Sequence, residues 1–284
     1  MKPISSPTNQ SGGMLRALFL ILMACILLAG CVTPSERFAA TAAKLRLEQE
    51  SIDSGLFRQR IFSNARARKT NATGTIHVYL DGDGTPWLRQ RWKAVDPTSR
   101  NPLILQLLHQ DESPAILLGR PCYHGLSNVP PCQDKYWTSH RYSREIVASM
   151  TRALKKWLEK HAFDNVVLIG FSGGGVLAVL MAPELPQVTT VVTVAANLDV
   201  AEWSRQHDYA PLEHSLNPAE LQLPINAKQI HISGAEDRNI PPRIIETYAK
   251  RHHARYLSLQ GQNHHCCWLE VWPEILRLFY TFRT

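Results

Sequence analysis

The chain has 284 residues, of which 44% are hydrophobic, and its 31 basic and 24 acidic side chains give a formal net charge of +7. This apolar fraction supplies a full core and excludes a disordered or low-complexity protein, while six cysteines are too few for a small disulfide-rich scaffold. The length suits one large domain or two small ones, and the positive charge points to a nucleic acid or an anionic membrane only if the basic residues cluster.

The first thirty residues have the pattern of an export signal. Lys2 and Arg16 are the only charged residues before Glu36, and an uncharged apolar run follows Arg16. This run is shorter than the roughly 20 apolar residues of a membrane-spanning helix, and a positive start followed by such a run is typical of a secretory signal. It ends in Leu28-Ala29-Gly30-Cys31, which resembles the lipobox of bacterial lipoprotein signal peptides.

The lipobox resemblance implies cleavage of residues 1–30 and attachment of lipid to Cys31. Several acyl chains give stable anchoring where one chain does not. In that family the residue after the cysteine influences sorting, and Val32 favours the outer membrane, facing the periplasm. The alternatives are an uncleaved anchor and an ordinary signal peptide. Cleavage leaves 29 basic against 24 acidic residues, a net charge of +5.

Residues 31–70 are predicted to form a lipidated tether and an N-terminal helical segment, with an amphipathic helix from Phe38 to about Ser51. The next stretch, residues 56–69, fits an edge strand or a helix. Its arginines suit contact with anionic lipid headgroups or simple solvation, because no aromatic residues interleave them in the manner of a nucleic-acid motif. We therefore expect a membrane contact through the lipid anchor and no nucleic-acid partner.

From residue 71 onward, apolar strands alternate with helices. The expected strands cover residues 75–80, 115–118, 165–170, 188–195, 229–233 and 255–259, the expected helices cover residues 142–160, 176–181, 242–251 and 268–282, and residues 102–109 could be either. This alternation predicts an α/β fold with three layers, in which helices cover both faces of a mostly parallel sheet. Residues 71–284 form the predicted domain, and residues 199–226, which lack a strand, are a possible small cap insertion.

The segment Gly170-Phe171-Ser172-Gly173-Gly174-Gly175 lies between a predicted buried strand and a helix. A serine at such a sharp turn adopts a strained backbone, and the glycines two residues to either side prevent steric clashes. The turn exposes the hydroxyl, and the N-terminus of the following helix favours negative charge. A Walker phosphate loop would need a lysine before the serine or threonine, which is absent here. The pattern predicts Ser172 as a nucleophile.

An activated serine needs a base, and the base needs an acid that orients it. Asp237 lies in a loop after one predicted strand, and His264 and His265 follow the last predicted strand. Sheets of this kind place their sites on strand-end loops. We favour His264 over His265 as the base and Asp237 as the acid, with Asp199 as a fallback acid.

The order Ser172, Asp237, His264 is similar to the catalytic pattern of the α/β-hydrolase superfamily, over roughly residues 75–284. The segment Asp237-Arg-Asn-Ile-Pro241 resembles that family's acid loop, Asp-x-x-Val-Pro. The resemblance implies a serine hydrolase that needs no cofactor and cleaves carboxylic esters through an acyl-enzyme. Its substrates would be small-molecule esters or acyl compounds. The alternatives are a serine peptidase of the same fold and a non-catalytic envelope lipoprotein that binds a partner.

The resemblance also implies an oxyanion hole built from backbone N–H groups. Gly173 would supply one, and Asp83 or Gly82, in the segment Asp81-Gly-Asp-Gly84, would supply the other. Family members often carry His-Gly at this place, and two carboxylates near an oxyanion would disfavour it unless they point away. Calcium is not expected, because an EF-hand loop needs a glutamate at its twelfth position, where this chain has Trp92.

Export would place the remaining cysteines in an oxidising compartment. Cys122 and Cys132 are then expected to form a disulfide across a short loop. For Cys266 and Cys267, which directly follow the histidines, a vicinal disulfide, free thiols and zinc binding are all open. Consecutive residues do not easily face one tetrahedral ion, so no metal site is expected.

Overall fold

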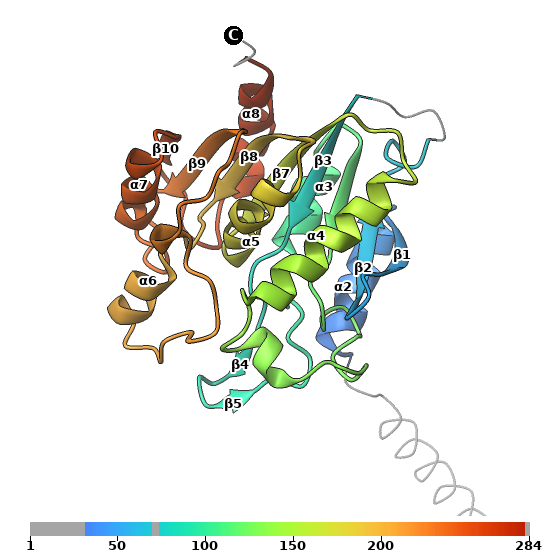
Figure 1. The fold of residues 1–284 in the computed structure, drawn as a ribbon, viewed down its shortest axis with the longest axis horizontal. Helices are drawn as coiled ribbons and strands as arrows, with labels where there is room; N and C mark the ends of the chain where they lie inside the picture. The colour runs from blue at the N-terminus through green and yellow to red at the C-terminus, as the bar shows by residue number, and fades with distance from the viewer. Residues whose placement is uncertain (1–31, 70–73, 282–284) are drawn as a thin grey trace, which may run out of the picture. The chain divides into compact units, whose positions relative to one another are not determined.

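A computed structural model describes residues 32–69 and 74–281 of the chain (Figure 1). Backbone contacts divide the chain into two units between Thr33 and Pro34, and the second unit carries the fold. The expected signal peptide, residues 1–30, and the expected lipidation site Cys31 lie outside the described residues. Among the helices that are described, none has the length and apolar character needed to cross a membrane.

A sheet of eight strands forms the middle layer, in the order β1-β2-β6-β3-β7-β8-β9-β10. Six neighbouring strands are parallel, which confirms the predicted mostly parallel sheet. They are β6 (Ala115–Leu118), β3 (Thr75–Leu80), β7 (Asn165–Phe171), β8 (Val188–Val194), β9 (Lys228–Gly234) and β10 (Arg255–Leu259). The other two, β1 (Glu48–Asp53) and β2 (Arg58–Ser63), form an antiparallel hairpin that pairs with β6.

Helices cover both faces of this sheet (Figure 1). One face carries α4 (Arg144–Leu158), α5 (Gly173–Met181) and α7 (Pro242–Arg251), and the other carries α2 (Pro34–Lys44), α3 (Leu103–His109) and α8 (Trp268–Thr281). Side chains of β7 alternate between the two cores: Val166 and Leu168 join the first, and Val167 and Ile169 join the second. A strand between two helical layers must be apolar on both sides, which explains its continuous apolar sequence. The predicted three-layer fold is confirmed.

The N-terminal segment differs from the prediction. Helix α2 ends at Lys44 rather than near Ser51, because Arg46 adopts a left-handed conformation with φ of 57°. The bonds Leu47 N to Ala42 O (2.9 Å) and Arg46 N to Ala43 O (3.0 Å) close the helix in the usual left-handed manner, which is unusual without a glycine. Residues 48–63 then form β1 and β2, so the sheet begins before the predicted domain boundary at residue 71.

Two further segments lie near the carboxyl ends of the parallel strands, at the lower edge of Figure 1. A small hairpin of β4 (Trp87–Leu88) and β5 (Trp92–Lys93) was not predicted, because strands this short leave no periodic signal. The predicted cap region, residues 199–226, contains α6 (Val200–Gln206) and a short 3-10 turn (Pro218–Glu220) but no strand. Two other 3-10 turns cover Asp134–Trp137 and Ala182–Glu184.

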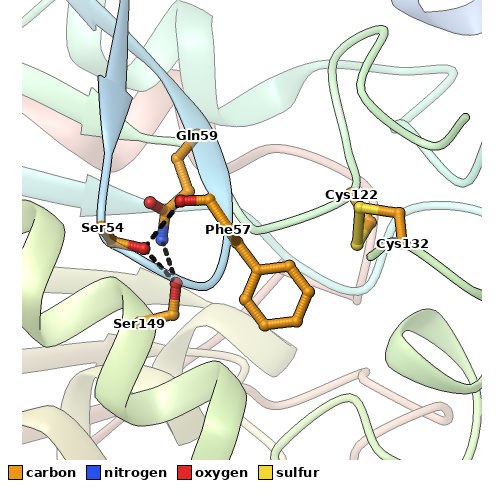
Figure 2. The surroundings of a disulfide bond; sticks show 6 residues. All are labelled: Ser54, Phe57, Gln59, Cys122, Cys132 and Ser149. Atoms are coloured by element: carbon orange, nitrogen blue, oxygen red, sulfur yellow. Dashed lines mark hydrogen bonds between the residues drawn. A yellow bond between two sulfur atoms is a disulfide. The ribbon is translucent and has the colours of Figure 1, made fainter. Parts of the chain in front are cut away.

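The turn between β1 and β2 is bonded to α4 (Figure 2). Ser54 Oγ donates to Phe57 O (2.8 Å) within the turn and lies 2.6 Å from Ser149 Oγ on α4. Ser149 Oγ also accepts a hydrogen bond from Gln59 Nε2 (3.1 Å). All of these groups are buried, so the hairpin is part of the main core and not an appendage.

Cys122 and Cys132 are joined by a disulfide in the loop that follows β6 (Figure 2). Beyond this loop, the Tyr136 ring meets the Phe57 ring edge-on at 4.9 Å between centroids. The disulfide therefore closes the loop on itself, and the segment that follows the loop packs against the N-terminal hairpin. By the chain-entropy argument, a bridge across a loop of this length stabilises the fold by roughly 2–3 kcal/mol.

Candidate active site

The sheet order places a site at the carboxyl ends of β3 and β7. From β3 the chain runs to β6 on one side and then returns to β7 on the other, and ligand sites of open parallel sheets lie at such a reversal. The 81–84 loop follows β3 and Ser172 follows β7, while Asp237 follows β9 and His264 follows β10. A cavity of about 990 Å³ opens at this point, and all four loops line it or lie beside it.

Ser172 occupies the sharp turn between β7 and α5. Its φ of 51° and ψ of −123° are strained for a residue with a Cβ. The turn is held by a hydrogen bond from Ser172 N to Val194 O (2.9 Å) and by close contact with the end of β3, where a Cβ on Gly174 would collide with Leu80 O. These contacts hold the half-buried Ser172 side chain against the cavity.

His264 lies between Ser172 and Asp237. His264 Nε2 is 3.1 Å from Ser172 Oγ, and His264 Nδ1 is 2.8 Å from Asp237 Oδ2. The other carboxylate oxygen, Oδ1, accepts hydrogen bonds from the backbone N–H groups of Asn239 (2.9 Å) and Ile240 (2.8 Å). With Nδ1–H donating to Asp237, Nε2 is free to accept the proton of Ser172. The structure thus brings the three predicted residues into one hydrogen-bonded chain.

The competing residues occupy other positions. His265 is exposed, its ring is nearly perpendicular to that of His264 at 5.1 Å between centroids, and it bonds to neither Ser172 nor Asp237. Asp199 caps the N-terminus of α6 by accepting a hydrogen bond from Glu202 N (3.1 Å). Because its carboxylate is used there, Asp199 does not orient the histidine.

Two backbone N–H groups near Ser172 are free to bind an oxyanion. Within the described part of the chain, the N–H groups of Gly173 and Asp83 donate no hydrogen bond. The third predicted donor, Gly82 N–H, already donates to Asp81 Oδ1 (2.8 Å). Gly82 lies against the nucleophile, since an added Cβ would be 3.3 Å from Ser172 Cβ. Gly173 and Asp83 are therefore the candidate donors.

The Asp83 side chain is bonded to groups that the sequence analysis did not single out. Arg120 Nη1 lies 2.6 Å from Asp83 Oδ1, while Arg141 Nη1 (2.9 Å) and Tyr142 Oη (2.6 Å) donate to Oδ2. Burial by itself would raise the pKa of the Asp83 carboxyl, but Arg141 and Arg120 hold that pKa well below its usual range. A carboxylate that is shielded from water needs cationic partners, and this was the one signal available in the sequence; it does not say which arginines serve.

Asp81 is the second carboxyl group of the loop. Burial raises the pKa of Asp81 to about 7. The hydrogen bond from Gly82 N and the positive charge of Arg120 lower this pKa, but burial outweighs them. While Asp81 is protonated, the two positive charges of Arg120 and Arg141 exceed the single negative charge of Asp83, so the charged groups around this loop are positive on balance. The acidic loop therefore does not oppose an oxyanion in the way that its sequence suggested.

The predicted cap forms one wall of the cleft and is bonded to the loop that carries the acid. Trp203 Nε1 (3.0 Å) and His207 Nε2 (2.7 Å) both bond to Asn239 O, two residues beyond Asp237. The His207 ring stacks on Tyr209 at 5.2 Å between centroids. Trp87 and Lys93 of the β4–β5 hairpin also line the cleft, and they pair directly across the hairpin and so share one face of it.

Cys266 and Cys267, close to His264, form a vicinal disulfide. Of the alternatives considered for this pair, zinc binding would need thiolates, which a disulfide does not offer. The described residues contain no group of three or more histidine, cysteine, aspartate or glutamate side chains placed to hold a metal ion.

No protein-family model and no curated protein sequence matches the chain. Solved structures do match it, and several that are described as esterases or α/β hydrolases share its architecture. The fold is that of the α/β hydrolases.

Three of the solved structures illustrate the likeness. Est1E from Butyrivibrio proteoclasticus has a TM-score of 0.58 at 11% identity, over 82% of this chain and 97% of Est1E. An esterase from Pyrococcus furiosus has a TM-score of 0.56 at 13% identity, over 84% of this chain and 90% of the esterase. An acylaminoacyl peptidase from Pyrococcus horikoshii has a TM-score of 0.55 at 10% identity, over 82% of this chain and 41% of the peptidase. Since the fold serves an esterase and a peptidase alike, it does not choose the bond that is cleaved.

The titration of Asp81 predicts a pH-dependent stability. The folded protein binds the Asp81 proton up to about pH 7, whereas the unfolded chain releases it near the ordinary value of 3.8, so stability is lost as the pH rises between these values. Asp81→Asn keeps an acceptor for Gly82 N–H and does not titrate. The unfolding free energy of this variant relative to the original chain should therefore rise between about pH 4 and pH 8, by up to roughly 4 kcal/mol. Urea denaturation across this range measures the difference, and parallel stability curves would contradict the prediction.

Proposed function

We propose that this protein is a serine hydrolase that cleaves carboxylic esters through an acyl-enzyme. The observation that carries the proposal is the hydrogen-bonded chain Ser172 Oγ–His264 Nε2 and His264 Nδ1–Asp237 Oδ2, at 3.1 and 2.8 Å, on the wall of a large cavity. Two free backbone N–H groups beside the serine add to it. A partner-binding protein has no need of such an arrangement, which argues against the non-catalytic alternative.

The reaction follows from the positions of these groups. Ser172 Oγ attacks the ester carbonyl carbon while His264 Nε2 takes the serine proton, and Asp237 stabilises the imidazolium. The carbonyl oxygen becomes an oxyanion that accepts hydrogen bonds from the Gly173 and Asp83 N–H groups. When the ester C–O bond breaks, His264 returns the proton to the departing alcohol. Water then attacks the acyl-enzyme in the same manner, which releases the acid and restores Ser172.

The lining of the cavity favours a polar ester with a short acyl group. Three large aliphatic side chains line the cavity: Leu103, Leu212 and Ile240. The other lining residues are polar, charged, aromatic or small. A long acyl chain gains about 0.8 kcal/mol per methylene only where it is buried among apolar groups. This lining offers aromatic rings and hydrogen-bonding groups to a polar alcohol or acid instead.

We further propose that the enzyme is anchored in the bacterial cell envelope through lipid on Cys31, in the outer membrane and facing the periplasm. Support comes from the apolar run that ends in Leu28-Ala29-Gly30-Cys31. The Cys122–Cys132 and Cys266–Cys267 disulfides are in keeping with an oxidising compartment.

The nucleophile and the base can be tested with a fluorophosphonate probe, which reacts with activated serines. Labelling should be strong in the original chain, absent in Ser172→Ala and lost in His264→Ala, because the serine is not activated without its base. His265→Ala is the matched control, since this neighbouring histidine is hydrogen-bonded to neither Ser172 nor Asp237, and it should keep its labelling. Labelling that survives Ser172→Ala would overturn the enzyme proposal.

The bond and the acyl length can be tested with chromogenic substrates. We expect p-nitrophenyl acetate to be cleaved with a kcat/KM at least about 10-fold above that of the palmitate ester, because a long chain finds only three large aliphatic side chains in the lining. The corresponding acetyl p-nitroanilide should be cleaved far more slowly. A preference for palmitate would contradict the short-chain proposal, and equal rates on the anilide would favour the peptidase.

Fractionation of cells that express the full chain tests the anchor. Cys31→Ser should move the protein from the membrane fraction to the soluble fraction, because the thiol that accepts the lipid is gone. Cys25→Ser, which changes another cysteine of the same apolar run, should leave it in the membrane fraction. If the Cys31→Ser protein still sediments with membranes, the lipid anchor is wrong.

A further inference from the structure

We propose that the Asp83 carboxylate, with the four side chains that hold its residue, is a positioning group that aims the Asp83 N–H at the oxyanion. This proposal rests on the ester hydrolysis proposed above and assigns roles to Arg120, Arg141, Tyr123 and Tyr142. None of these four side chains is bonded to Ser172 or His264, and Arg120, Tyr123 and Tyr142 do not line the cavity, so they would act on the reaction through the Asp83 backbone.

The first observation concerns the peptide bond that joins Gly82 to Asp83. Arg120 Nη1 donates to Gly82 O (3.1 Å) and also to Asp83 Oδ1 (2.6 Å). A peptide unit is planar, and in the trans form its C=O and N–H point in opposite directions. This bond is not among the cis bonds of the described chain. When Arg120 holds the Gly82 carbonyl, it therefore fixes the direction of the Asp83 N–H, away from the guanidinium.

The second observation concerns the next peptide bond. Tyr123 Oη donates to Asp83 O (2.9 Å). Together with Arg120 this fixes both peptide units that flank the Asp83 Cα, while the side chain is fixed by Arg141 and Tyr142. Burial raises the pKa of Tyr123 to about 12, so its hydroxyl stays a donor. A loop with three anchored groups around one Cα has little freedom to turn its N–H elsewhere.

The arginines are themselves held. Arg120 is 1% exposed, and its Nη2 donates to Arg141 O (2.8 Å). Arg141 is also buried, and its Nε donates to Thr138 O (2.8 Å). Water cannot easily replace contacts this deeply buried, and the network is therefore preorganised before substrate binds.

The third observation is the contact between this network and the other oxyanion donor. A Cβ on Gly173 would collide with Asp83 Oδ1 and Tyr142 Oη, so the network lies directly against the first residue of α5. The same group of side chains therefore contacts both candidate donor residues, Gly173 and Asp83, and sets the distance between their N–H groups. An ion cluster that served stability alone would have no need to lie against the residue after the nucleophile.

The test uses tyrosine-to-phenylalanine variants, since loss of an arginine would remove one of the two charge partners of the half-buried Asp83 and so endanger folding. Tyr123→Phe and Tyr142→Phe each remove one hydrogen bond to Asp83 and keep the ring. Tyr248→Phe is the matched control: Tyr248 is a buried tyrosine on α7, and its hydroxyl has no hydrogen-bond partner within the described chain. Thermal melting of each variant establishes that it is folded.

Loss of one oxyanion donor lowers kcat by about 10²–10³ in related reactions, so a misaimed donor should cost part of this. We expect each single variant to lower kcat for p-nitrophenyl acetate by about 10-fold and the double variant by about 100-fold, with KM changed by less than about 3-fold. The inhibition constant of a boronic acid, which forms a tetrahedral adduct with the serine, should rise in the same proportion. Tyr248→Phe should change none of these values.

Two results would overturn the proposal while leaving the proposed function intact. One is a folded double variant whose kcat and boronic acid affinity equal those of Tyr248→Phe. The other is a loss confined to KM, which would place these tyrosines in substrate binding. An original chain that neither cleaves the ester nor labels at Ser172 would instead contradict the proposed function itself.

Discussion

A half-buried carboxylate bonded to two buried arginines is the constraint on which the rest of the site depends. Charges withdrawn from water are costly unless each is paired and hydrogen-bonded, and Asp83 meets this condition for Arg120 and Arg141 while it also accepts a hydrogen bond from Tyr142. Its members come from the loop after β3 and from the long connection between β6 and α4. The network thus joins chain segments that the sheet alone would leave independent, and it does so directly beside the nucleophile.

The sheet contributes a different kind of order. Parallel strands end on one edge, so loops after β3, β7, β9 and β10 meet although they are far apart in the chain. The strain of the Ser172 backbone is supported by the ends of β3 and β8, which hold the turn on both sides. The geometry of the site therefore depends on the stability of the central strands.

The sequence predicted the central strands, the three layers and the residues now found together because each carries a local signal: apolar runs for β7 and β8, glycines around Ser172, strand-end loops for Asp237 and His264. It did not predict the end of α2, since Arg46 closes that helix without a glycine. It also missed Arg120 and the other partners of Asp83, because pairing across distant segments leaves no pattern in one sequence. The choice between Gly82 and Asp83 depended on a single backbone hydrogen bond.

The bonds from Trp203 and His207 to Asn239 have a consequence for how the specificity of this cleft can diverge. Trp203 and His207 tie the cap side of the wall to the loop that carries Asp237, because both side chains bond to the same backbone carbonyl. Substitutions in α6 therefore act on substrate choice and on the acid together. The β4–β5 hairpin, which contributes Trp87 and Lys93, has no such bond to the acid loop within the described chain, so substitutions on its face act on substrate choice without passing through Asp237.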